Sequence, residues 1–89
     1  MSEIDYEVAT EIFKALANET RLRILTGLLE NECNVTGIVE NLELPQSTVS
    51  QQLGLLRNRG IIKGRKEGAN VCYRVIDERI PKILDLMKE

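Results

Sequence analysis

One face of the segment 45–60 carries polar side chains that bear no charge. These side chains are Gln46, Ser47, Thr48, Ser50 and Gln51. A solvent-exposed helix face is ordinarily rich in Glu and Lys instead. Amide and hydroxyl groups form hydrogen bonds with base edges and phosphates, and they do not repel a negatively charged surface. The residue types in this segment therefore favour recognition of DNA.

The same segment has the ends of an α-helix. Pro45 suits the first helical turn, because its missing N–H would have no partner there. Gly60 suits the left-handed residue that follows a helix C-terminus. An apolar stripe at helical spacing is formed by Val49, Leu53 and Leu56. We expect a recognition helix at about residues 45–59, with this stripe packed on the core.

Basic side chains are concentrated in the same third of the chain. The 89 residues carry a net charge of −2. Residues 45–74 nevertheless hold six basic groups and one acid, whereas residues 1–44 hold three basic groups and nine acids. A basic third in an acidic chain indicates an anionic partner. The alternative is chance clustering of charge on a solvated hairpin.

Three amphipathic segments precede the recognition helix. Residues 6–17 predict a first helix, whose apolar stripe is wide enough for both the core and a second subunit. Asn18 is a good N-cap for a core helix over about residues 19–30. Asn34 is expected to cap a short third helix that ends at Leu42. Two short helices joined by a brief turn, the second polar outside, have the layout of a helix-turn-helix.

The periodicity after Gly60 changes to that of strands. Residues 61–66 and 71–76 predict two strands, and residues 67–70 supply the Gly and Asn of a hairpin turn. We expect a wing at 61–76 whose side chains lie along a DNA backbone or in a minor groove. The expected DNA contacts are Gln46, Ser47, Thr48, Ser50, Gln51, Gln52 and Arg57 from the helix, and Arg65, Lys66, Asn70 and Arg74 from the wing.

A last amphipathic helix is predicted at residues 78–88, with Pro81 in its first turn. Its apolar stripe must be covered, and pairing with the first helix of a second subunit does this economically. The expected fold is mainly α with a β-hairpin wing, in the order α-α-α-α-β-β-α. We expect residues 1–89 to form a single winged helix-turn-helix domain.

Three stretches resemble the arsenic-repressor (ArsR/SmtB) family of bacterial and archaeal winged-helix repressors. They are FKALANETRLRIL (13–25), LPQSTVSQQLGLLRNRGII (44–62) and KEGANVCYRV (66–75). The resemblance covers about residues 10–80. It implies a homodimer joined through the first and last helices, with two recognition helices in successive major grooves of a partly palindromic operator. It also implies repression of transcription that an inducer relieves.

The motifs by which members of this family bind metals are missing. The Cys-x-Cys pair near the third helix is replaced by Cys33-Asn34-Val35-Thr36, and the chain has no His for the last-helix ligands. Zinc and similar metals require several Cys or His ligands. We therefore expect no metal site and no cofactor, with a metal-responsive repressor that uses unusual ligands as an alternative. Gln52 stands where members often have His, and it keeps a hydrogen-bonding side chain.

Two cysteines, Cys33 and Cys72, are too few for a disulfide scaffold. In winged-helix folds the segment before the third helix often runs beside the return strand, so the two sulfur atoms could lie near each other. One interpretation is two unrelated thiols that act as small apolar groups. The other is a redox pair whose disulfide moves the wing and changes operator affinity. The thiol-sensing branch of the family usually has a cysteine where Thr26 stands and another near the C-terminus, which is absent.

Other classes of function find little support in the sequence. An enzyme is not expected, because there is no His to serve as a general base and no Gly-rich phosphate loop. No apolar run is long enough for a membrane span, and the acidic N-terminus lacks the layout of a signal peptide, so we expect the cytoplasm. The rival from another class is a winged helix that binds a partner protein, whose binding would lack the steep salt dependence of DNA contacts.

Overall fold

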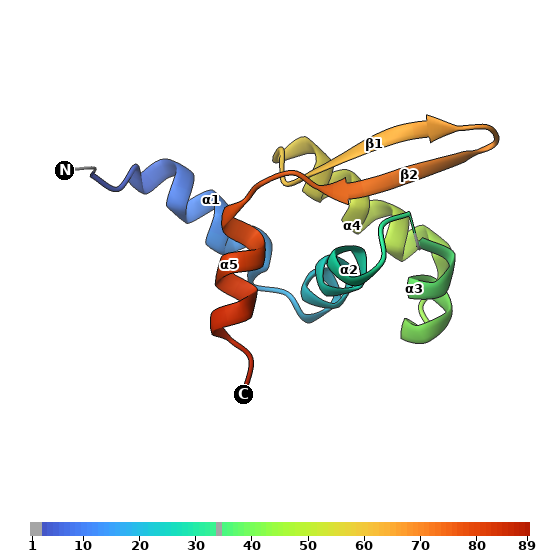
Figure 1. Ribbon diagram of the computed structural model, residues 1–89, viewed down its shortest axis with the longest axis horizontal. Coiled ribbons are helices and arrows are strands. Elements are labelled where there is room, and N and C mark those ends of the chain that lie inside the picture. The colour runs from blue at the N-terminus through green and yellow to red at the C-terminus, as the bar shows by residue number, and fades with distance from the viewer. Residues whose placement is uncertain (1–2, 34) are drawn as a thin grey trace.

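The computed structural model describes residues 3–33 and 35–89. Five helices and a two-stranded antiparallel hairpin form a winged helix-turn-helix in the predicted order (Figure 1). The elements are α1 (Tyr6–Leu16), α2 (Glu19–Glu30), α3 (Val35–Leu42), α4 (Gln46–Asn58), β1 (Ile62–Glu67), β2 (Asn70–Val75) and α5 (Arg79–Leu86). The predicted N-cap at Asn34 lies outside the described residues.

Local side-chain chemistry sets the helix ends. The Asn18 side chain accepts a hydrogen bond from the Arg21 N–H at 3.0 Å, which confirms the predicted cap of α2. Gly60 has φ +73°, the left-handed conformation expected after α4. Pro45 is the N-cap of α4 and precedes its first turn, so the helix begins one residue later than predicted.

The hairpin pairs Ile62 with Val75 at its base and Glu67 with Asn70 at its tip. The turn therefore has two residues, Gly68-Ala69, and is shorter than the predicted four. Gly68 has φ +61°, as tight two-residue hairpins require. No helix in the described part of the chain has the length and hydropathy needed to cross a membrane.

The two faces of β2 are covered differently near the tip. Val71 is 42% exposed, whereas Cys72 is only 5% exposed. The α2–α3 loop covers Cys72, because the Cys33 N–H donates to the Tyr73 carbonyl at 3.3 Å. Val71 lies instead against Gly64, where a Cβ atom would come within 3.0 Å of it. Tertiary contacts, which alternation cannot reveal, therefore decide which face of β2 is buried.

The core draws buried apolar side chains from all five helices and from the start of β1. Its fully covered members include Ile24, Leu25, Leu28, Leu56, Ile61, Ile62 and Ile80. On the predicted stripe of α5 only Ile80 is fully buried, and Met87 is 73% exposed. On α1, Tyr6 and Phe13 are 77% and 61% exposed. Both helices belong to the same side of the ribbon (Figure 1), and their exposed side chains present apolar surface.

Asp77 fixes the start of α5. Its carboxylate accepts hydrogen bonds from the Arg79 N–H at 3.0 Å and from the Arg79 guanidinium at 2.9 and 2.8 Å. The side-chain hydrogen bond from Arg79 holds the pKa of Asp77 below its usual value. Because the folded-state pKa is depressed, this stabilisation is present above the unfolded pKa and is lost as the pH falls through the folded pKa.

Asp77→Ala should lower the free energy of unfolding at neutral pH by about 1 kcal/mol, the usual cost of losing a side-chain hydrogen bond to an N–H at a helix start. The difference from the wild type should shrink as the pH falls below the ordinary aspartate pKa, and it should vanish once the pH is below the depressed pKa of the folded protein. Urea unfolding across this pH range measures both. Asp85→Ala is a matched control, because Asp85 pairs only with the exposed Lys88. An equal loss in both variants, or a loss independent of pH, would contradict this role for Asp77.

Candidate nucleic-acid interface

The outer face of α4 presents most of the side chains that were expected to contact DNA. Gln46, Ser47, Ser50 and Gln51 are exposed. Thr48 and Gln52 are half-buried. Beneath this face, Val49, Leu53 and Leu56 pack in the core. The apolar stripe fixes the rotation of α4 about its axis, and this rotation leaves four uncharged polar side chains in solvent.

The wing carries cations beside this helix. Lys66, Asn70 and Arg74 are exposed on the two strands. Neither Lys66 nor Arg74 forms an ion pair within the part of the chain that the structure describes. Arg65, also expected to contact DNA, is ion-paired with Glu67. Residues two apart on a strand share a face, so this pairing was accessible from the sequence.

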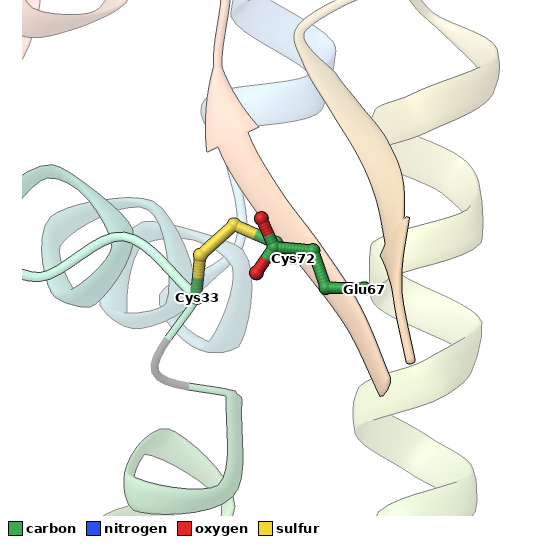
Figure 2. Close-up of side chains that lie close together, drawn as sticks. All are labelled: Cys33, Glu67 and Cys72. Carbon is green, nitrogen blue, oxygen red and sulfur yellow. A yellow bond between two sulfur atoms is a disulfide. The ribbon is translucent and has the colours of Figure 1, made fainter. Parts of the chain in front are cut away.

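A disulfide joins Cys33 and Cys72, which are 39 residues apart (Figure 2). It links the α2–α3 loop to β2, with a Cα–Cα distance of 4.2 Å. The two sulfur atoms thus lie together, as the interpretation of the cysteines as a redox pair requires. The Glu67 carboxylate lies beside them, and ligand atoms of the three residues are all within 4.8 Å of one another. Glu67 belonged to no site predicted from the sequence, because only the hairpin register brings it to Cys72.

A groove of about 670 Å³ separates α4 from the outer half of the hairpin. Gln46, Ser50 and Arg57 line its helix side, and residues 69–73 line its wing side. Cys33 lies at the same groove. The predicted recognition helix, the predicted wing and the cysteine pair therefore meet at one surface.

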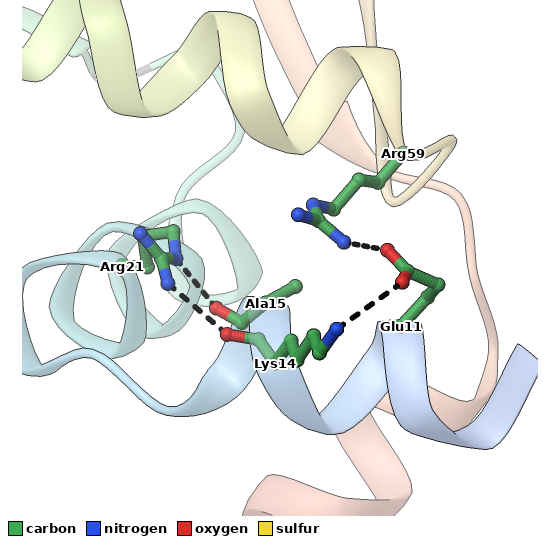
Figure 3. Close-up of polar contacts among 5 residues, drawn as sticks. All are labelled: Glu11, Lys14, Ala15, Arg21 and Arg59. Carbon is green, nitrogen blue, oxygen red and sulfur yellow. Dashed lines mark hydrogen bonds and ion pairs between the residues drawn. The ribbon is translucent and has the colours of Figure 1, made fainter. Parts of the chain in front are cut away.

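Gln52 is bound within the protein. Its side-chain carbonyl accepts a hydrogen bond from Arg21 Nη1 at 2.9 Å. Arg21 also donates to the backbone carbonyls of Ala15 at 2.6 Å and Lys14 at 3.1 Å, at the C-terminus of α1 (Figure 3). A cation in the first turn of a helix opposes the helix dipole. The unfavourable position of Arg21 in the first turn of α2 was therefore the feature of the sequence that indicated a specific hydrogen-bond partner for it.

A second link joins α1 to the C-terminal end of α4. Arg59 pairs with Glu11, which also lies 3.9 Å from the Lys14 ammonium (Figure 3). Arg59 was not among the expected DNA contacts, and its guanidinium is ion-paired with Glu11 within the protein. Arg21 thus holds the middle of α4, and Arg59 holds its C-terminal end. This arrangement couples the position of the polar helix face to α1.

Comparison with protein families gives a match to the model described as "Bacterial regulatory protein, arsR family", over residues 18–63. This span runs from the cap of α2 to the start of β1 and contains the helix-turn-helix.

Individual relatives agree with this match. The chain is 45% identical to the HTH-type transcriptional regulator MJ1325 of Methanocaldococcus jannaschii over 85 residues, which cover 94% of this chain and 96% of that protein. It superposes on HlyU from Vibrio cholerae with a TM-score of 0.86 and 38% identity, covering 97% and 94% of the two chains. It superposes on the transcriptional repressor PagR of Bacillus anthracis with a TM-score of 0.81 and 33% identity, covering 93% and 95%.

Proposed function

Because the chain belongs to the ArsR family of winged helix-turn-helix transcriptional regulators and is a DNA-binding regulator, we propose that it acts as a homodimeric repressor on a partly palindromic operator. The observation that carries this proposal is the exposed, uncharged polar face of α4 beside a wing whose Lys66 and Arg74 form no ion pair with the described residues. As a regulator of transcription, it would work where the chromosome is, in the cytoplasm.

The proposed DNA contacts form two groups, those to base edges and those to phosphates or the minor groove. Gln46, Ser47, Ser50 and Gln51 would reach base edges and nearby phosphates when α4 lies in the major groove. The half-buried Thr48 would contact the backbone at the start of the helix. Four further side chains would bind phosphates or the minor groove beside the wing, namely Arg57, Lys66, Asn70 and Arg74. Arg65 would join them once it leaves Glu67.

Gln52 takes a different role in this proposal from its expected one. Its carbonyl is held by Arg21, so we assign it to positioning α4. Through Arg21 it connects the helix to the end of α1, and α1 carries the exposed apolar side chains of the proposed dimer surface. Tyr6 and Phe13 on α1, with Leu86 and Met87 at the end of α5, would be covered by a second copy. Two α4 helices would then face the same side of a DNA duplex.

Lys66→Ala tests the assignment of the wing to the DNA backbone. The variant should bind every DNA sequence more weakly, and the slope of log K against log salt should fall in magnitude by about 1 per subunit, because one phosphate contact is lost. Fluorescence anisotropy at several salt concentrations measures both. Lys82→Ala on α5 makes the same change of charge away from the groove and should leave the slope unchanged. Identical slopes for Lys66→Ala and wild type would place the wing away from DNA.

We also propose that the cysteine pair controls operator binding. In the reduced chain, the exposed Cys33 thiolate would attack a low-molecular-weight disulfide and release one thiolate. The Cys72 thiolate would then displace the second, forming the Cys33–Cys72 bond with a transfer of two electrons to the oxidant. The bond ties β2 to the α2–α3 loop at the groove beside α4. A wing held in place loses less freedom on binding, so the oxidised form should bind DNA more tightly.

Reduction should weaken operator binding by about fivefold or more, the low end of typical coupling between sites. Anisotropy titrations of oxidised and reduced protein, with free thiols counted in each sample, give this ratio. The variant with both Cys33→Ser and Cys72→Ser should bind equally in both conditions. Equal affinity of the oxidised and reduced wild type would end the proposed control, as would two free thiols that persist after treatment with the oxidant.

A further inference from the structure

The cluster of Cys33, Cys72 and Glu67 gathers three metal-binding side chains at one point. Their sulfur and carboxylate oxygen atoms all lie within 4.8 Å of one another. The three residues come from the α2–α3 loop, β2 and the end of β1, and Figure 2 shows the Glu67 carboxylate turned toward the two sulfur atoms. Sequence spacing alone does not bring such residues together. The fold does so, at the edge of the groove between α4 and the wing.

Besides the disulfide, backbone contacts hold the three residues near one another. The Cys33 N–H is bonded to the Tyr73 carbonyl, next to Cys72. The strand register places Glu67 opposite Asn70 and Arg65 opposite Cys72. Cys33 has φ 68°, a conformation that residues other than glycine rarely adopt, and it directs the side chain at β2. Reduction to two thiols would therefore leave all three side chains near one another.

Two thiolates and one carboxylate form a ligand set for a thiophilic divalent cation. Tetrahedral zinc sites have ligand distances of about 2.0–2.3 Å, which put neighbouring ligand atoms about 3.3–3.8 Å apart. The two sulfur atoms are joined in the structure, so reduction must first let them separate to this distance, while the Glu67 carboxylate already lies within 4.8 Å of both. Thiolates disfavour Mg²⁺ and Ca²⁺, which prefer oxygen ligands. We propose that the reduced chain binds one Zn²⁺ or Cd²⁺ ion through Cys33, Cys72 and Glu67, with water from the groove as the fourth ligand.

Binding of the metal ion would change the protonation of the two thiols and the ion pair of Glu67. Both thiols lose their protons to solvent, so affinity rises with pH. Glu67 exchanges its ion pair with Arg65 for the metal ion. The Arg65 side chain is 68% exposed, so its release costs little and frees one more cation on the wing. Binding of the metal ion would thereby change the charge available on the surface proposed to contact DNA.

The disulfide and the metal ion exclude each other, because the sulfur atoms of a disulfide are no longer thiolates. Only the reduced chain is competent to bind, and the disulfide form serves as an internal control. The site does not depend on the proposed redox control of operator binding. A metal titration without DNA tests the site, whereas operator binding by metal-free protein tests the redox control.

The experiment titrates Cd²⁺ into the full chain, reduced with a phosphine in metal-free buffer. An ultraviolet band from sulfur-to-cadmium charge transfer should saturate at one ion per chain, and Zn²⁺ should compete for the same site. Glu67→Gln should weaken binding roughly 10-fold or more while both thiols remain. Glu32→Gln, a carboxylate next to Cys33 that lies outside the cluster, should bind like the wild type. Oxidised protein should show no band.

Circular dichroism of each variant establishes that it is folded before its titration is compared. Absence of the charge-transfer band in reduced wild type would overturn the proposal. So would equal affinity of Glu67→Gln and wild type, since the ion would then lie elsewhere. A band that persists when both cysteines are replaced by serine would overturn it as well.

Discussion

Phe13→Asp should convert the protein to a monomer and weaken operator binding roughly 10²- to 10⁴-fold, because the second half-site would no longer be bound by a linked subunit. Phe13 is 61% exposed on α1, in the apolar surface that α1 and α5 share. A carboxylate there would have to be desolvated on dimerisation, which is costly without a partner. The isolated fold should tolerate the change. Sedimentation equilibrium and anisotropy measure the two effects.

Asn41→Asp is a matched control for Phe13→Asp, because it adds the same charge at an exposed position on α3. This control should remain dimeric and lose little affinity. A dimeric Phe13→Asp variant would place the subunit interface elsewhere. A monomeric variant with wild-type affinity would show that one subunit suffices for the operator.

Gln51→Ala should weaken operator binding by about 1–3 kcal/mol and relax the preference at one base position. Gln51 is exposed on the polar face of α4. An amide that forms two hydrogen bonds with a base carries sequence information, so affinity for random DNA should change little. Binding to a library of single-base operator variants reports the altered position.

Gln52→Ala provides the comparison, since it removes the same side chain one position further along the helix. Gln52 is held by Arg21, so its loss should lower the free energy of unfolding and leave base preference unchanged. Equal loss of affinity on operator and random DNA for Gln51→Ala would show that base recognition lies elsewhere. A shift in base preference for Gln52→Ala would return that residue to the set of DNA contacts.

The features that the sequence predicted well depend on neighbouring residues. Asn18 caps α2 through a backbone N–H three residues away, and Gly60 ends α4 because it tolerates a positive φ. The apolar stripe of α4 fixed its buried face, so the exposure of Ser47 and Gln51 followed from periodicity. Such local rules are sufficient for the order of the elements and for most of the polar helix face.

The features that the sequence did not predict depend on contacts between distant segments. Gln52 was expected to contact DNA. Its hydrogen-bond partner Arg21 lies 31 residues away in the chain, so the spacing of residues along α4 did not reveal the pairing. The burial of Cys72 depends on the α2–α3 loop, which no alternation within β2 reveals. Glu67 became a candidate ligand only through the hairpin register. The fold brings both cysteines to this same carboxylate.

The most direct test of the central claim is DNA selection from a random library, followed by salt titration of binding to the selected site. The account predicts a partly palindromic site bound in preference to random DNA. The slope of log K against log salt should be about −5 while Arg65 remains paired with Glu67, because Arg57, Lys66 and Arg74 in each of two subunits would contact phosphates. Failure to enrich any sequence, or binding that does not depend on salt, would contradict the account and favour a protein partner for this surface.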